Sequence, residues 1–232
     1  MSDHSKRIQS LAREAALLPQ EEVLQISARS QELVIGIPKE ESLQEKRVAL
    51  VPEAVALLVA RGHQVLVESG AGDQAHFQDN DYSESGAHIV YDRRQVFQTG
   101  MVIKVEPPTM DEVQLMGMNQ TIISALQWTV QPKGLLAALA AKKTTAIAWD
   151  FLQNDNGIFP LVRAMGEIAG NSAILIAGEL LAGPHGRGSL FGGVSGVRPT
   201  EVVIIGAGTV GEFAARAAIG LGASVKVFDN SP

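Results

Sequence analysis

The 232-residue chain contains no cysteine, which excludes disulfide bonds, thiol catalysis and zinc–thiolate sites. Its 19 Lys and Arg residues are outnumbered by 25 Asp and Glu residues, and they are scattered along the chain, which argues against a nucleic-acid-binding surface. No two of the five histidines have the spacing of metal ligands, so we expect no metal site. Residues 1–23 lack the apolar core of a signal peptide, and no apolar run reaches the roughly 18 residues of a membrane span. We therefore expect a cytoplasmic segment without a membrane span.

What the chain does have is enough apolar sequence for a packed core, since 46% of its residues are hydrophobic. From residue 32 onward, short apolar runs alternate with helical stretches. We expect strands at 32–37, 63–68, 88–90, 101–105, 121–126 and 144–150, and helices at 52–62, 79–87, 91–98, 132–143 and 160–182. This alternation predicts an α/β fold with a doubly wound parallel sheet that is covered by helices on both faces.

Changes in this pattern divide the chain into four segments. We expect a helical arm at 1–30, a substrate-type α/β domain at 31–155, a connecting helix and Gly-rich loop at 156–199, and the start of a Rossmann domain at 200–232. The arm and the connecting helix offer apolar faces, which predicts a homo-oligomer. The last segment has only two strands of such a domain, so we expect the chain to be truncated there and to be inactive on its own.

The clearest motif is G-x-G-x-x-G at Gly206, Gly208 and Gly211, between a β-branched apolar run and a helix of small residues. In this motif the first glycine permits a tight turn, the second lets the backbone approach a pyrophosphate, and the third lets helix and strand pack closely. Asp229 ends the second strand, where its carboxylate can accept hydrogen bonds from ribose hydroxyls and would repel a 2′-phosphate. We therefore expect NAD as the cofactor; the alternative is a Gly-rich turn without a ligand. The cofactor-binding candidates are Gly206, Gly208, Thr209, Val210, Gly211 and Asp229.

Two charged residues in the first domain are candidates for substrate binding. Arg47 lies in "GIPKEESLQEKRVALVPEAV" and Lys104 in "VIKVEPP", each in or near a loop that follows a predicted strand. In open parallel sheets, ligands bind at the carboxyl ends of the strands. An Arg there can hold a carboxylate at two points, and a Lys can polarise a carbonyl oxygen. The alternative is that both are ordinary solvated or ion-paired charges.

Several longer stretches resemble one family. "IGIPKE", "RGHQVLVESGAG", "MGEIAG", "HGRGSLFGGVSGVRP" and "VVIIGAGTVGEFAARAAIGLGASVKVFD" together are similar to the alanine dehydrogenase and NAD(P) transhydrogenase α-subunit family. The resemblance covers residues 33–232 and is closer to the alanine dehydrogenases in the loop "GRGSLFGGVSGV". It implies an enzyme of amino-acid metabolism, an NAD-dependent oxidoreductase that converts L-alanine to pyruvate and ammonia by oxidative deamination.

The resemblance also implies roles for single residues, with two departures. Arg47 falls where the family binds the substrate carboxylate, and Lys104 lies near the Lys that binds the substrate oxygen. In an alignment without gaps, Glu106 stands at the position of the family's substrate-binding Lys, and Gln127 stands at the position of its catalytic His. A glutamine can orient a ligand by hydrogen bonds but cannot take up a proton at neutral pH. We expect the neighbouring Trp128 to fill the core rather than to flank a nicotinamide.

Because of these departures two other functions stay open. In a transhydrogenase α-subunit, the domain binds NAD(H) for hydride transfer to NADP on another domain, and no substrate base is needed. A non-catalytic NAD-binding or assembly module would also be consistent with the loss of the histidine.

Overall fold

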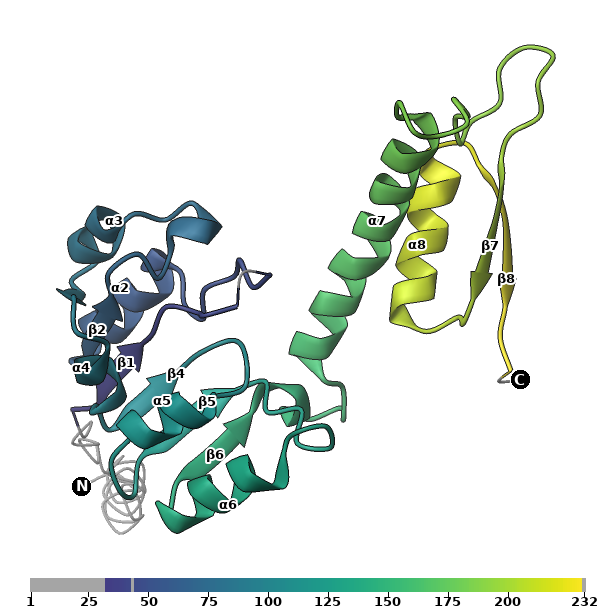
Figure 1. Ribbon diagram of the computed structural model, residues 1–232. Helices are drawn as coiled ribbons and strands as arrows, with labels where there is room; N and C mark the ends of the chain where they lie inside the picture. Colours follow the sequence, from purple (N-terminus) through teal and green to yellow (C-terminus); the bar gives the residue numbers. More distant parts are fainter. Residues whose placement is uncertain (1–31, 43, 231–232) are drawn as a thin grey trace, which may run out of the picture. The chain divides into compact units, whose positions relative to one another are not determined.

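The computed structural model describes residues 32–42 and 44–230, so the predicted arm at 1–30 lies outside the described residues. The first sheet has six parallel strands in the order β3-β2-β1-β4-β5-β6 (Figure 1). The strands are β1 (Val34–Ile37), β2 (Gln64–Glu68), β3 (His88–Val90), β4 (Met101–Ile103), β5 (Thr121–Ser124) and β6 (Thr145–Ala148). This is the strand order of a doubly wound dinucleotide-binding fold, in which the order reverses between β1 and β4. The prediction of a doubly wound α/β fold is therefore confirmed.

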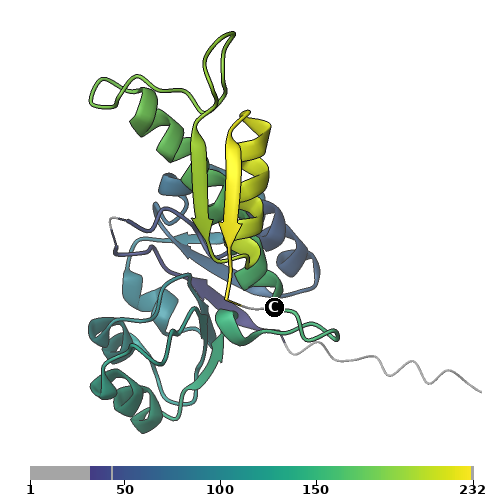
Figure 2. The same ribbon diagram turned by 90° about the vertical axis from the view of Figure 1, so that its right-hand side faces the viewer.

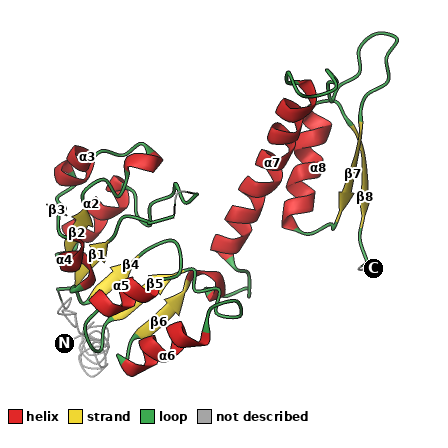
Figure 3. Ribbon diagram, viewed as in Figure 1, coloured by secondary structure: helices red, strands yellow, loops and turns green. Residues whose placement is uncertain are grey.

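The helices that connect these strands are mostly short (Figure 3). They are α2 (Pro52–Ala60), α3 (Asp79–Glu84), α4 (Arg93–Phe97), α5 (Met110–Leu115) and α6 (Lys133–Ala141), with 3₁₀ turns η1 (Asp73–Ala75) and η2 (Trp149–Phe151). Pro52 begins α2, where its missing N–H costs nothing. A capping box between Thr109 and Glu112 begins α5, a helix that the apolar pattern does not predict.

The sheet separates two apolar cores, because successive side chains of a strand point to opposite faces. Ile35 and Ile37 of β1 pack with Val55 of α2 in one core. Between them, Gly36 points to the other face, where a Cβ would overlap the carbonyl oxygen of Val96 in α4. The second core joins β4 and β5 to α5 and α6. Helices therefore cover both faces of the sheet.

The remaining elements form a helix pair and a two-stranded parallel sheet. They are α7 (Pro160–Ala182), β7 (Glu201–Ile205), α8 (Thr209–Gly220) and β8 (Ser224–Phe228), and Figure 2 shows β7 and β8 running side by side. At Gly170 of α7, an added Cβ would overlap the carbonyl oxygen of Val210 and would lie 2.9 Å from the amide nitrogen of Ala214. Glycine therefore allows α7 and α8 to pack with their backbones nearly in contact. No helix among the described residues is both long and apolar enough to cross a membrane.

Candidate functional site

A cavity of about 380 Å³ lies at the carboxyl ends of the strands of the first sheet. Segments that follow β1, β4, β5 and β6 form its wall, and the first turns of α7 contribute apolar side chains. Its lining residues are Arg47, Val48, Ala49, Val105, Ala125, Gln127, Trp149, Asp150, Leu161, Val162 and Met165. This edge of a doubly wound sheet is where ligands bind, and the volume is in the range of small-molecule sites.

Arg47 is the cationic side chain of this cavity, and it is half exposed. Glu45 holds one edge of its guanidinium, with Oε1 2.8 Å from Nε and Oε2 2.6 Å from Nη2. The remaining nitrogen, Nη1, donates to the Sδ atom of Met165 at 3.0 Å. The hydrogen bonds with Arg47 lower the pKa of Glu45, and those with Glu45 raise the pKa of Arg47. Both groups are therefore charged at neutral pH.

Gln127 also lines the cavity, from the loop that follows β5. Its backbone has a φ of 43°, which is uncommon for a residue other than glycine. Such conformations persist where the surrounding structure imposes them, and they are found at functional sites more than elsewhere. The neighbouring Trp128 is 54% exposed, so the expectation that it fills the core is wrong.

Among the cavity residues that the sequence did not identify, two carry polar groups. Trp149 and Asp150 belong to η2, which begins directly after β6. The indole N–H of Trp149 donates to the carbonyl oxygen of Lys104 at 2.8 Å. The Oδ1 atom of Asp150 is buried, and no described residue donates a hydrogen bond to it. The signal that could have found both is their position at the carboxyl end of a parallel strand, the criterion that selected Lys104.

Lys104 itself is buried in a network of charges. Its side chain is 2% exposed, and Nζ lies 2.9 and 2.8 Å from the two carboxylate oxygens of Glu112 and 3.3 Å from Oε2 of Glu40. Arg93 also binds Glu112. Burial raises the pKa of Glu40, although the charge of Lys104 opposes that effect. Lys104 is absent from the residues that line the cavity with Arg47, so a role in binding substrate stays a prediction.

Hydrogen bonds connect this network of charges to the residues that line the cavity. The backbone N–H of Val105 donates to Oε1 of Glu40 at 2.6 Å, and Trp149 binds the preceding carbonyl group. Val105 and Trp149 both line the cavity. In this structure Lys104 and Glu40 therefore position the segment that lines the cavity.

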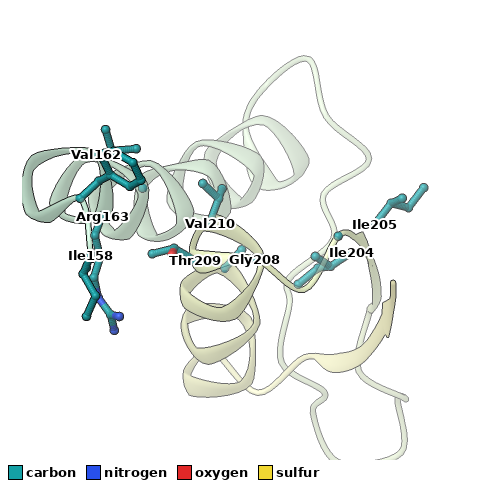
Figure 4. Close-up of a pocket in the computed structure, with 13 residues that line it drawn as sticks. Ile158, Val162, Arg163, Ile204, Ile205, Gly208, Thr209 and Val210 are labelled. Atoms are coloured by element: carbon teal, nitrogen blue, oxygen red, sulfur yellow. The ribbon is translucent and has the colours of Figure 1, made fainter. Parts of the chain in front are cut away.

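A second cavity, of about 550 Å³, lies over the glycine motif. Figure 4 shows Gly208, Thr209 and Val210 at the start of α8, beside Val162 and Arg163 of α7. No side chain caps α8, and α8 begins at this cavity, so the unpaired N–H groups of its first turn are available to an anion.

The glycines of the motif have distinct positions. Gly206 has a φ of 105°, in the region that favours glycine. A Cβ on Gly208 would meet no atom within 4 Å, whereas a Cβ on Gly211 would overlap the carbonyl oxygen of Gly206. The carboxylate of Asp229, which follows β8, accepts a hydrogen bond from the backbone N–H of Ala207, between Gly206 and Gly208. Loop, helix start and acidic residue therefore fit the pyrophosphate and ribose of a dinucleotide.

The candidate residues from the sequence that line a cavity fall into two groups, one for each cavity. Arg47 and Gln127 share one cavity, while the glycine motif with Thr209 and Val210 lines the other. Across residues 32–42 and 44–230, no group of three or more His, Asp or Glu side chains is placed to hold a metal ion.

The fold and the two cavities define a class: α/β proteins with a doubly wound parallel domain and a βαβ unit of the dinucleotide-binding type. The chain belongs to the alanine dehydrogenase/PNT family. Residues 36–169 match the model "Alanine dehydrogenase/PNT, N-terminal domain", and residues 172–232 match "Alanine dehydrogenase/PNT, C-terminal domain". The family resemblance stated from the sequence is thereby confirmed.

Individual relatives agree with this assignment. The chain is 43% identical over 199 residues to an alanine dehydrogenase of Mycolicibacterium smegmatis, covering 85% of this chain and 53% of that protein. It is 40% identical over 198 residues to an alanine dehydrogenase of Bacillus subtilis, covering 85% of this chain and 52% of that protein. The chain thus spans about half the length of the curated relatives it matches.

Solved structures give the same fold. An L-alanine dehydrogenase superposes with a TM-score of 0.81 at 40% identity, covering 86% of this chain and 55% of that one. A transhydrogenase from Sinorhizobium meliloti superposes with a TM-score of 0.74 at 24% identity, covering 86% and 57%. At that identity the transhydrogenase supports the fold alone.

Proposed function

We propose that the protein is an NAD-dependent oxidoreductase of the alanine dehydrogenase type, which converts L-alanine to pyruvate and ammonia by oxidative deamination. The observation that carries this proposal is the Arg47 cavity at the carboxyl ends of the first sheet, in a chain whose relatives are alanine dehydrogenases. An arginine beside a small cavity suits a small carboxylate such as an amino acid or a 2-oxo acid.

The proposed cofactor is NAD, held by the glycine motif and Asp229. The uncapped start of α8 would bind the pyrophosphate, and the Asp229 carboxylate would bind the adenosine ribose and repel a 2′-phosphate. When bound, NAD supplies the acceptor for the hydride that leaves the substrate α-carbon. Comparing NAD with NADP as ligands, for the wild type and for Asp229→Gly, tests this choice. We expect the variant to lose most of the preference for NAD.

The residues of the first cavity would hold the substrate in place. Arg47 would bind its carboxylate through the guanidinium nitrogens that Glu45 leaves available. Gln127 would orient the substrate by hydrogen bonds, because an amide cannot take up a proton at neutral pH. For Lys104 to bind the substrate oxygen, as the family resemblance implies, its Nζ atom would have to leave Glu112 and Glu40.

The protein is proposed to act as a cytoplasmic homo-oligomer. Large apolar side chains of α7 are exposed in this chain, among them Ile168, Leu175 and Leu180 at 57, 62 and 69%. Exposed apolar side chains of this size favour burial against another subunit.

Two alternatives remain. Gln127 in the cavity favours a transhydrogenase α-subunit, which would bind NAD(H) for hydride transfer to NADP and would need no substrate base. A non-catalytic NAD-binding or assembly module is consistent with the same residue.

Three measurements on the purified full-length protein separate the three functions. In the first, the protein is mixed with L-alanine and NAD, and NADH formation is followed by absorbance. NADH formation that requires L-alanine supports the dehydrogenase. Hydride transfer only with NADPH and a partner subunit would instead support the transhydrogenase, and NAD binding without either reaction would support the module.

A further inference from the structure

Asp150 carries a feature that the proposed roles of Arg47 and Gln127 leave unexplained. It lines the same cavity as Arg47, and its Oδ1 atom is buried without a hydrogen-bond donor among the described residues. A buried carboxylate oxygen without a donor is destabilising, because the hydrogen bonds to water that it loses are not replaced. A ligand with a donor group would remove that cost.

The basic side chains in and behind the cavity wall already have carboxylate partners. Glu45 holds one edge of the Arg47 guanidinium, and two carboxylates hold the Lys104 ammonium group. Gln127 adds an uncharged amide to the cavity wall. Asp150 and Arg47 are the two charged side chains among the residues that line this cavity, and they come from different segments of the chain.

The two charges match the two ends of an amino acid. At neutral pH an amino acid carries a carboxylate and an ammonium group, and charge-assisted hydrogen bonds to ionised partners are the stronger kind. Arg47 suits the carboxylate end. A 2-oxo acid has the same carboxylate but offers no ammonium group to a second, acidic partner.

We propose that Asp150 determines the specificity of this cavity for amino acids by binding the substrate α-ammonium group, while Arg47 binds the carboxylate. The proposal rests on the proposed function, and it adds a residue that separates L-alanine from pyruvate. Asp150 reaches the cavity because β6 ends at Ala148 and the chain turns into η2. The hydrogen bond of Trp149 to the Lys104 carbonyl group fixes that turn.

Calorimetric titration of L-alanine and of pyruvate, each into the wild type and into Asp150→Asn, tests the proposal. Asparagine keeps the size of the side chain and removes its charge. We expect Asp150→Asn to bind L-alanine about tenfold more weakly or worse, since the ammonium group would then face an uncharged amide oxygen in place of a carboxylate, and to bind pyruvate as well as before. Asp155→Asn, in an exposed loop, is the matched control and should change neither affinity.

The remaining outcomes are distinct. Equal loss of both ligands in Asp150→Asn, or loss of neither, would overturn the role of Asp150. Circular dichroism of each variant serves as the independent check that it is folded. If the wild type binds neither ligand, the proposed substrate class fails, and the role of Asp150 fails with it.

Discussion

Glu45 and Arg47 form a two-point ion pair, and Arg47 lines the first cavity. The carboxylate contacts Nε at 2.8 Å and Nη2 at 2.6 Å, and Oε1 also accepts from the backbone N–H of Arg47 at 2.9 Å. Only 8% of the Glu45 side chain is exposed. An internal carboxylate thus occupies an edge of the guanidinium that a ligand carboxylate could use.

The first prediction follows from this competition. Glu45→Gln should tighten pyruvate binding by about threefold to tenfold, because glutamine keeps an oxygen that can accept from Arg47 while it removes the competing charge. Titration calorimetry of pyruvate into both proteins measures the effect. Weaker binding would instead mean that Glu45 is needed to orient Arg47.

The second prediction concerns the buried network around Lys104. Lys104→Met should lower the free energy of unfolding by about 3–5 kcal/mol, because Glu40 and Glu112 would be left buried without their shared partner. Urea unfolding followed by circular dichroism measures this change, with Lys133→Met, at an exposed position, as the control. If Lys104→Met is as stable as the wild type but binds substrate more weakly, Lys104 is a substrate ligand and not a structural residue.

A third prediction compares two glycines of α8. Gly211→Ala should lower both the melting temperature and the NADH affinity, because the new Cβ would overlap the Gly206 carbonyl oxygen. Gly220→Ala meets no atom within 4 Å and should be neutral, or stabilising by up to about 1 kcal/mol. Thermal melts and NADH fluorescence titrations measure both properties. Equal NADH affinity in the two variants would contradict binding at the motif.

The fourth prediction concerns pH. Burial raises the pKa of Tyr82 to about 12, and its hydroxyl donates to the carbonyl oxygen of Leu50 at 2.8 Å. In the unfolded chain a tyrosine ionises near pH 10. Between about pH 10 and 12 the unfolded state therefore loses this proton first, and stability falls as pH rises, by about 3 kcal/mol in total.

Tyr82→Phe removes this dependence. At pH 7 the variant should be about 1 kcal/mol less stable than the wild type, because one buried hydrogen bond is lost. The difference should shrink or reverse by pH 11. Urea unfolding at both pH values measures it, and Tyr91→Phe, at a side chain 87% exposed, is the control. A difference that stays constant with pH would rule out ionisation of Tyr82 as its source.

The strands and longer helices could be predicted from the sequence because their patterns are local. The run at 34–37 is apolar and β-branched, and Pro52 marks the start of a helix. Helix α5 was missed although the equally short helices α3 and α4 were expected from the sequence. Its start depends on the Thr109–Glu112 capping box rather than on an apolar repeat.

The site was only partly predictable, for a different reason. Lys104 could be identified because it lies at the end of a predicted strand. Its ion pair with Glu40 could not be predicted, because Glu40 lies 64 positions earlier in the chain and no local sequence pattern links the two. The predicted strand at 144–150 was wrong at its end. It stops at Ala148, and the turn that follows brings Asp150 to the cavity. Because β6 ends two residues earlier than predicted, Asp150 lies in the cavity wall and not in the sheet.

Trp149 also gives the protein an optical reporter. The chain has two tryptophans, and Trp128 is largely exposed, whereas Trp149 is hydrogen-bonded to the Lys104 carbonyl group in the wall of the cavity. In a Trp128→Phe protein, indole emission would come from the cavity wall alone. The wavelength and intensity of that emission would then follow the polarity of the cavity as small molecules enter, without an added label.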